Sequence, residues 1–367
     1  MNHYPPSGGR GRKMSLRKLK SVLRAKEHLP YLVSDLVNIR YLTGFTGSYA
    51  CMIIGDKKSF FISDSRYEEY ARDILPESID FVLLNSDLYE TIRGVLKRMG
   101  EKALYLEEHS IMLSTYLEMK ARLRGIRLVP GESEVNRIRI IKKEEETVLL
   151  MKAAEITDRC FYHLLGFIKP GMIEWEVAAE IESFYRANGC RKSSFPAIVA
   201  SGSGSSMPHY ETSMTKKIEP GDVLLIDMGC EYMGYNSDLT RTIFVHSVDP
   251  FLEKIYRIVL DAQAAALGSV KPGITTGALD GKARQVIADA GYGDNFGHSL
   301  GHGLGLEVHE LPAVKSGDFR LKKNMVITVE PGVYVPGRGG VRIEDMVLVT
   351  GTGGETLTKC AKEITIV

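Results

Sequence analysis

The sequence predicts an α+β protein of two domains: an N-terminal α/β domain with its own sheet, and a larger C-terminal domain containing a duplicated helix–helix–strand–strand unit. Three observations support this prediction. The chain has 367 residues, more than the usual size of one domain. Strand-like and helix-like segments alternate over residues 15–130. Further along, Lys-Pro-Gly occurs at 169–171 and again at 271–273, each time between two long amphipathic runs.

The N-terminal part begins with a segment rich in proline, glycine and basic residues. We expect residues 1–14 to be a disordered extension, followed by a basic amphipathic helix near 14–26 that is structural rather than a transit peptide. Apolar runs predict strands at 30–34, 50–56, 59–64, 79–85, 103–107 and 126–131. Helical patterns separate them at 65–74, 86–99 and 110–124. A charged stretch then indicates a linker near 131–143, which gives domains 15–133 and 134–367.

The C-terminal domain carries an internal repeat. Its expected helices are roughly 145–167 and 174–187 in the first half, and 251–269 and 277–290 in the second. An acid near the end of a strand follows at a matching offset. Asp227 lies 58 positions after Lys169, and Glu330 lies 59 positions after Lys271. Because Lys-Pro-Gly alone is ordinary turn chemistry, it is the matching offsets that indicate a duplication.

Five side chains of the kind that bind metals lie in or beside apolar, strand-like runs: Asp227, Asp238, His302, Glu330 and Glu344. Carboxylates among valine, isoleucine and leucine are costly to bury unless a positive charge neutralises them, and the sequence supplies few cations nearby. Four carboxylates and one imidazole suit a pair of divalent ions that share bridging oxygens. Each half of the repeat contributes two of the carboxylates. The constellation predicts a dinuclear metallohydrolase.

Composition describes an ordinary globular protein. Lys and Arg total 47 against 46 Asp and Glu, so net charge argues against nucleic acid or a membrane as a partner. No apolar run is long enough to span a bilayer, and no secretory h-region is seen, so we do not expect export. The five cysteines are scattered and form no CxxC pair, which favours reduced thiols. We therefore expect a cytoplasmic location.

Two glycine-rich segments superficially suggest phosphate-binding loops. They are residues 201–206 and 301–305, and neither matches the GxxxxGK[ST] pattern. The second contains His302. We therefore interpret the glycines as allowing close backbone approach to metal and substrate.

Four blocks in the C-terminal domain resemble a known family. They are residues 226–243, 298–310, 325–334 and 339–345, and their order and spacing are similar to those of the proline peptidases, the aminopeptidase P and prolidase group with a pita-bread fold. Residues 38–48 and 64–67 resemble the creatinase-like N-terminal domain of the same group. The resemblance covers nearly the whole chain from about residue 15. It implies a pita-bread catalytic domain at 134–367 and a creatinase-like domain at 15–133.

The resemblance also implies a role for each metal ligand. Asp227 would chelate one ion, Asp238 and Glu344 would bridge both, and His302 and Glu330 would complete the ligand shell of the second ion. Carboxylates can bridge, and a neutral imidazole is a good terminal ligand, so the chemistry agrees. Glu330 would also act as the proton shuttle between water and the leaving nitrogen.

Four further residues belong to the expected site. By the family pattern His209 and His309 lie beside the scissile carbonyl and stabilise the tetrahedral intermediate. A histidine in a loop is by itself more often a solvated side chain. His298 is expected to line the substrate site. Arg342, which we also expect in the substrate-binding part of the site, is expected to orient the acidic ligands. The alternative interpretation of Arg342 is an exposed arginine on a strand.

The leading functional hypothesis is an Xaa-Pro aminopeptidase with some dipeptidase activity. The main alternative is a prolidase, and a remote alternative is a non-catalytic peptide-binding module. A creatine-type amidinohydrolase is disfavoured, because that activity does not need five metal ligands. One position departs from the family pattern. Some prolidases carry an arginine four residues after the second active-site histidine, where it meets the dipeptide carboxylate. Here the residue at that position is Ala313. Lys315 or Arg320 could replace it. Candidates for the proline pocket are Phe195, His298 and Tyr235.

The expected cofactors are two divalent ions per subunit. The ligand set suits Mn(II), and Co(II), Fe(II) or Zn(II) would also bind. The expected partners are a peptide with proline in second position and a second copy of the chain in a homodimer, as the resemblance implies.

Overall fold

The computed structural model describes residues 9–367 and divides into two compact units after Arg139. The division lies inside the expected linker 131–143 but beyond the expected boundary at 133/134. The reason is the short helix α6 (Glu134–Arg139), which belongs to the first unit. There Arg139 Nη1 donates to Asn38 Oδ1 at 2.7 Å, and the Glu134 amide donates to the Tyr31 hydroxyl at 3.3 Å.

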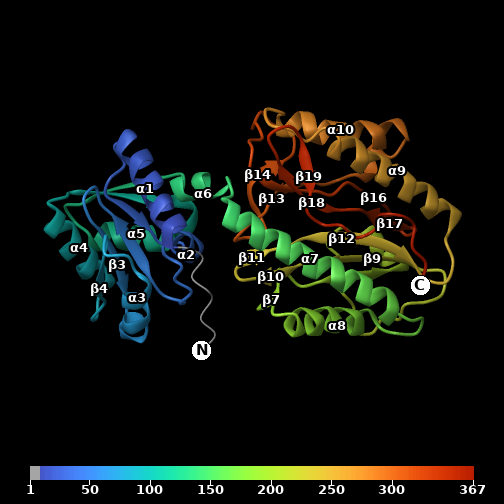
Figure 1. The fold of residues 1–367 in the computed structure, drawn as a ribbon, viewed down its shortest axis with the longest axis horizontal. Helices are drawn as coiled ribbons and strands as arrows, with labels where there is room; N and C mark the ends of the chain where they lie inside the picture. Colours follow the sequence, from blue (N-terminus) through green and yellow to red (C-terminus); the bar gives the residue numbers. More distant parts are fainter. Residues whose placement is uncertain (1–8) are drawn as a thin grey trace. The chain divides into compact units, whose positions relative to one another are not determined.

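The first unit contains one six-stranded sheet in the order β4-β3-β2-β1-β5-β6 (Figure 1). Its strands are β1 Tyr31–Val33, β2 Cys51–Ile54, β3 Ser59–Ser63, β4 Ile79–Leu83, β5 Ala103–Glu107 and β6 Arg127–Gly131, each within a predicted strand. Its other helices are α1 Gly9–Ala25, α2 Leu36–Thr43, α3 Glu68–Ile74, α4 Leu88–Met99 and α5 Leu113–Arg122, with 3₁₀ turns η1 Ser65–Tyr67 and η2 Glu108–Ser110.

Helix α1 departs from the sequence prediction. It begins at Gly9, so residues 9–14, expected to be disordered, are helical, and residues 1–8 lie outside the described part of the chain. Leu16, Leu19 and Leu23 are buried at helical spacing. Burial of these leucines stabilises the helix from about Leu16 onward, and the helix extends from there back to Gly9.

The second unit repeats one pattern, a helix pair followed by strands. The four helices are α7 Glu144–Phe167, α8 Glu174–Ala187, α9 Pro250–Leu267 and α10 Thr276–Asp289, which confirms the predicted runs. The strands of the first half are β7 Lys192–Ser193, β8 Ile198–Ser201, β9 Val223–Met228, β10 Cys230–Tyr232, β11 Tyr235–Asn236 and β12 Leu239–Phe244, with the turn η3 Gly202–Ser206. Those of the second half are β13 Gly301–Gly303, β14 Glu310–Val314, β15 Val326–Val329, β16 Gly332–Val335, β17 Gly339–Arg342, β18 Asp345–Val349 and β19 Gly354–Thr356, preceded by the turn η4 Gly293–Asn295.

The strands of the second unit form short antiparallel sheets. The first half has the orders β12-β9-β8 and β11-β10-β7, and the second half has β14-β13-β15-β18-β19 and β16-β17. Figure 1 shows the strands between α8 on one side and the pair α9–α10 on the other. The two central pairs, β9–β12 and β15–β18, correspond to each other in the two halves.

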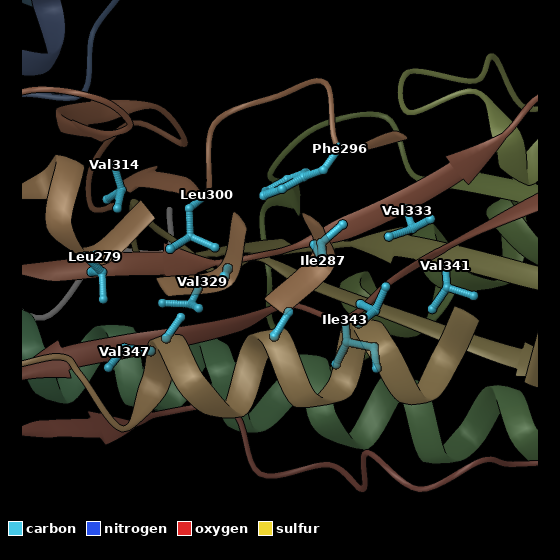
Figure 2. Packing of buried hydrophobic residues seen from close by; sticks show 14 of the residues in the cluster. Leu279, Ile287, Phe296, Leu300, Val314, Val329, Val333, Val341, Ile343 and Val347 are labelled. Atoms are coloured by element: carbon cyan, nitrogen blue, oxygen red, sulfur yellow. The ribbon is translucent and has the colours of Figure 1, made fainter. Parts of the chain in front are cut away.

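Two hydrophobic cores hold these layers together. One packs α7 and α8 against β9 and β12 through residues such as Phe161, Ile181 and Ile226. The other packs α9 and α10 against the strands of the second half, and Figure 2 shows Leu279 and Ile287 of α10 within it. Each half therefore buries its own helix pair, as expected for a duplication. Within residues 9–367, no helix is long and apolar enough to cross a bilayer.

Candidate metal centre

Each half places its two acids on one pair of antiparallel strands. In the first half, Asp227 lies near the end of β9 and Asp238 directly precedes β12. In the second half, Glu330 directly follows β15 and Glu344 directly precedes β18. Because paired strands run in opposite directions, the end of one lies beside the start of the next. The four carboxylates thus occupy matching ends of two strand pairs.

Backbone hydrogen bonds connect these ends to one another. The Glu344 amide donates to the Thr240 carbonyl at 3.1 Å, which joins the second half to β12. The Glu330 amide donates to the Leu300 carbonyl at 2.8 Å, which brings the segment before β13 beside the ligands. His302 is the middle residue of β13. The chain thereby brings all five predicted ligands to one place.

The glycines on either side of His302 have a role that differs from the one expected. A Cβ on Gly301 would lie 2.1 Å from the Thr328 carbonyl oxygen, and a Cβ on Gly303 would lie 2.1 Å from the Leu311 carbonyl oxygen. Both contacts are with neighbouring strands. These glycines therefore allow β13 to approach its neighbouring strands closely. The sequence-based expectation was a close approach to metal or substrate.

The ligand atoms converge on a small volume. Asp238, His302 and Glu344 each offer one atom, and these atoms all lie within 4.8 Å of one another. His302 Nε2 lies 3.6 Å from Asp238 Oδ2 and 3.4 Å from Glu330 Oε1. Such a set of carboxylate oxygens and one imidazole nitrogen is the chemistry that holds divalent ions.

Asp227 has one oxygen bound to Arg342 and one oxygen without a partner in the described part of the chain. Its Oδ2 accepts a hydrogen bond from Arg342 Nη2 at 2.7 Å. Its Oδ1 is buried and has no hydrogen-bond partner among the described residues. A buried carboxylate oxygen without a donor is costly, and a cation beside it removes that cost.

Three hydrogen bonds orient the other ligands. Thr240 Oγ1 donates to Glu344 Oε2 at 2.8 Å, and Thr328 Oγ1 donates to Glu330 Oε1 at 3.0 Å. His302 Nδ1 lies 3.1 Å from the Gly303 carbonyl oxygen, which can only accept. A proton on Nδ1 leaves Nε2, the atom nearest the carboxylates, as a lone-pair donor.

The electrostatics of the cluster also fit bound cations. Burial raises the pKa of Asp238 well above its ordinary value, and the neighbouring Asp227 and Glu330 raise it further. Burial, with Asp238 nearby, does the same to Glu344. Burial lowers the pKa of His302 to about 4, so the imidazole is neutral at physiological pH. In the described part of the chain, Arg342 is the only permanent cation paired with these four carboxylates.

His209 and His309 lie in exposed positions on loops. The rings of His309 and His302 meet edge to face with centroids 4.4 Å apart, which places His309 at the ligand cluster. His209 follows η3, and the carbonyl of its neighbour Pro208 accepts a hydrogen bond from Arg342 Nη1 at 3.3 Å. His309 therefore contacts the centre directly, whereas the backbone next to His209 is connected to it through Arg342.

His298 and Arg342 share a partner that sequence reasoning missed. His298 Nε2 lies 2.9 Å from the Tyr334 hydroxyl, and Arg342 Nη1 donates to the same hydroxyl at 2.9 Å. Arg342 Nε donates to Thr240 Oγ1 at 2.9 Å. Arg342 is thus buried and engaged with Asp227, a predicted ligand, and with its neighbours, which favours the orienting role over an exposed strand arginine. Tyr334 lies in the block 325–334, but its partners are distant in sequence.

The residues proposed for substrate selection take different positions. Ala313 is exposed on β14 and lies opposite His302 in the strand register. Arg320 Nη1 donates to the Gly273 carbonyl at 2.8 Å, whereas Lys315 is exposed. The Tyr235 hydroxyl donates to Glu146 Oε1 at 3.0 Å. Phe195 is half-buried.

Comparison with known proteins gives consistent matches. Residues 148–351 match metallopeptidase family M24, and residues 16–141 match the creatinase/prolidase N-terminal domain. The chain is 39% identical over 340 residues to an Xaa-Pro dipeptidase of Pyrococcus horikoshii, which covers 91% of this chain and 93% of that one. An Xaa-Pro dipeptidase structure from Bacillus anthracis has a TM-score of 0.94 at 38% identity and covers 97% of this chain and 100% of that one. An X-Pro aminopeptidase structure from Thermotoga maritima has a TM-score of 0.85 at 36% identity and covers 92% and 97%. The predicted resemblance and fold class are confirmed.

Proposed function

This chain belongs to metallopeptidase family M24, and we propose that it is an Xaa-Pro peptidase, which hydrolyses the bond between a first residue and a proline in second position. The observation that carries the proposal is the convergence of Asp238, His302 and Glu344 within 4.8 Å. Asp227 Oδ1, which is buried and has no hydrogen-bond partner within residues 9–367, supports it. A non-catalytic binding module would have no need for the full set of five ligands.

The family depends on two divalent ions, which lower the pKa of a water molecule and polarise a carbonyl when they are bound. In this chain Asp238 and Glu344 would be shared between the two ions, with Asp227 on one and His302 and Glu330 on the other. Glu330, oriented by Thr328, would also take a proton from water and give it to the proline nitrogen.

The other site residues hold the substrate. His309, at the ligand cluster, and His209 would donate to the developing oxyanion. His298 would line the substrate site, where Tyr334 fixes its ring. Arg342 would act on substrate indirectly, by holding Asp227 and the loop that carries His209.

Two substrate classes remain within this proposal. The names of the Pyrococcus horikoshii and Bacillus anthracis relatives favour an Xaa-Pro dipeptidase, and we place that activity first. Ala313 favours an aminopeptidase acting on longer peptides, which was the sequence-based expectation. The test is hydrolysis of Xaa-Pro, Xaa-Pro-Yaa and Xaa-Ala-Yaa peptides by metal-free protein loaded with one metal at a time. Failure to cleave either proline peptide with any metal would refute the proposal.

Three further properties stay predictions. Mn(II) is our expected ion, with Co(II), Fe(II) and Zn(II) as the alternatives that the metal-loading experiment compares. The homodimer is tested by light scattering of the purified chain. The cytoplasmic location is tested by cell fractionation.

A further inference from the structure

One carboxylate outside the metal centre forms hydrogen bonds with both ends of the loop that carries His209. Glu174 is the first residue of α8, and its side chain is 0% exposed. Its Oε1 accepts from the Ser201 amide at 2.8 Å and from Ser201 Oγ at 2.7 Å. Its Oε2 accepts from the Ser213 amide at 3.0 Å. A single buried side chain therefore holds both ends of the segment 202–212.

Other contacts complete the base of this segment. Lys216 Nζ lies 3.6 Å from Glu174 Oε1, donates to the Ser201 carbonyl and lies 5.6 Å from the centre of the Tyr210 ring. Burial and a hydrogen bond to Glu174 raise the pKa of Tyr210 to about 12, so its hydroxyl keeps its proton. Tyr210 directly follows His209. The carboxylate thus also reaches the residue next to the proposed oxyanion donor.

The imidazole of His209 depends on this backbone for its position. The residue is exposed, and no hydrogen bond of its ring is found among the described residues. The segment has two contacts on the far side from Glu174. The Gly340 amide donates to Ser205 Oγ at 2.8 Å, and Arg342 Nη1 donates to the Pro208 carbonyl. Thr212 Oγ1 also accepts from the Val199 amide at 2.9 Å, and Ser201 pairs with Leu224 on the neighbouring strand, so removing the Glu174 contacts would loosen both ends of the segment without releasing them.

We propose that Glu174 is a positioning residue that acts on catalysis through His209, by fixing the 202–212 segment at both ends. The inference rests on the proposed function, in which His209 donates to the substrate. A fully buried carboxylate is costly unless hydrogen-bonded, and here its donors come from the two ends of one catalytic segment. Misplacing a catalytic group by about 1 Å costs about 100-fold in rate, so loop anchoring has a measurable kinetic effect.

The test is a double-mutant cycle with Glu174→Gln and His209→Ala. In the glutamine variant the amide oxygen can still accept from Ser201, but the new NH₂ group faces the Ser213 N–H and that anchor is lost. We expect Glu174→Gln to lower kcat/KM by roughly 10- to 100-fold in the wild-type background, and by less than about 2-fold in the His209→Ala background. Equal losses in both backgrounds would show that Glu174 has only a structural role and would overturn the proposal.

A matched control is available on the same turn of helix. Glu176 Oε2 accepts from the Ile173 amide at 2.7 Å, and no hydrogen bond from Glu176 to the 202–212 segment is found in the described part of the chain. Glu176→Gln should leave kcat/KM unchanged, and hydrogen exchange of residues 202–212 should accelerate only in Glu174→Gln. If Glu174→Gln does not fold, Ser201→Ala, which removes the hydrogen bond from Ser201 Oγ to Glu174, enters the same cycle. A wild-type chain that cleaves no proline peptide refutes the proposed function, whereas unaltered exchange in Glu174→Gln refutes the positioning role alone.

Discussion

Arg342 and Asp227 form an ion pair in which the arginine engages one carboxylate oxygen, and the other oxygen is buried and has no hydrogen-bond partner among the described residues. The Nη2–Oδ2 distance is 2.7 Å, and Oδ1 is the partnerless atom. The same guanidinium donates to the Tyr334 hydroxyl and to Thr240 Oγ1. Because the donors of arginine are fixed in a plane, this geometry sets the direction in which Asp227 faces a metal.

Substituting Arg342 with lysine should therefore weaken metal binding. Lysine keeps the charge but cannot donate to Asp227, Tyr334 and Thr240 at once. Loss of a residue that orients a ligand typically lowers metal affinity about 10- to 100-fold. Competition with a chelator, monitored by metal content, measures it. Wild-type affinity in Arg342→Lys would mean that the ligands orient themselves.

The bridging acids should be more sensitive than any other pair. Asp238→Ala or Glu344→Ala should abolish hydrolysis and lower the metal content per subunit, because each would serve both ions. Metal analysis and a peptide assay measure the two effects. Asp261→Ala, an exposed position on α9, is the matched control. Full metal content with near wild-type turnover in either variant would exclude a dinuclear centre of this arrangement.

His309 should affect turnover without affecting metal content. Removing one oxyanion donor typically costs about 10²–10³-fold in kcat, and we expect that loss in His309→Ala. The exposed His163 on α7 gives the control substitution. Loss of metal from His309→Ala would show that the residue is a ligand, since its ring lies against that of His302.

Sequence patterns predicted most of the elements because their signals are local. The helices that begin at Glu144 and Pro250 show the apolar periodicity of a helix. The six strands of the first unit are short apolar runs between turns. Helix α2 was missed, although its ends are marked. Asp35 accepts from the Val37 amide at 2.8 Å, and Gly44 adopts a left-handed conformation with φ 82°. At eight residues, α2 is too short for periodicity to reveal it.

The candidate site was predictable only as a set of ligand types. A carboxylate in an apolar strand is unusual in itself, so Asp227 and Glu330 were visible. Tyr334, Thr240 and Glu174 were not visible, because each contacts at least one partner that is distant in sequence. Glu174 in particular looks like an ordinary helix N-terminal acid, and only the fold reveals that it closes another loop.

The stability of the metal-free protein should fall as pH rises from about 5 to 7. Burial raises the folded-state pKa of Glu330 from 4.5 to about 7, and burial also raises those of Asp238 and Glu344. The folded chain therefore binds more protons than the unfolded chain in this window, so the free energy of unfolding decreases with pH. His302 and His298, whose pKa values burial lowers to about 4, act in the opposite direction but are two groups against three.

Divalent ions should reverse this trend, because they take the place of the protons. We expect the increase in Tm on adding Mn(II) to be larger at pH 8 than at pH 5. Differential scanning calorimetry of chelator-treated and metal-loaded protein at both values gives the comparison. The Asp238→Ala variant should show a smaller metal effect. An equal increase in Tm at both values would mean that these carboxylates do not control metal binding.

Substrate length should depend on the strand position opposite His302. Ala313 provides no charge there, and Arg320 is bound to the Gly273 carbonyl, so Lys315 or a partner subunit is the remaining candidate to meet a free proline carboxylate. We expect Ala313→Arg to raise kcat/KM for an Xaa-Pro dipeptide relative to Xaa-Pro-Yaa, since a charge-assisted hydrogen bond contributes about 1.5–3 kcal/mol. Parallel assays with the same first residue measure the ratio. If wild-type protein cleaves only the dipeptide and Lys315→Ala removes that activity, the lysine performs the role, and the chain is a dipeptidase that recognises the carboxylate from a neighbouring position.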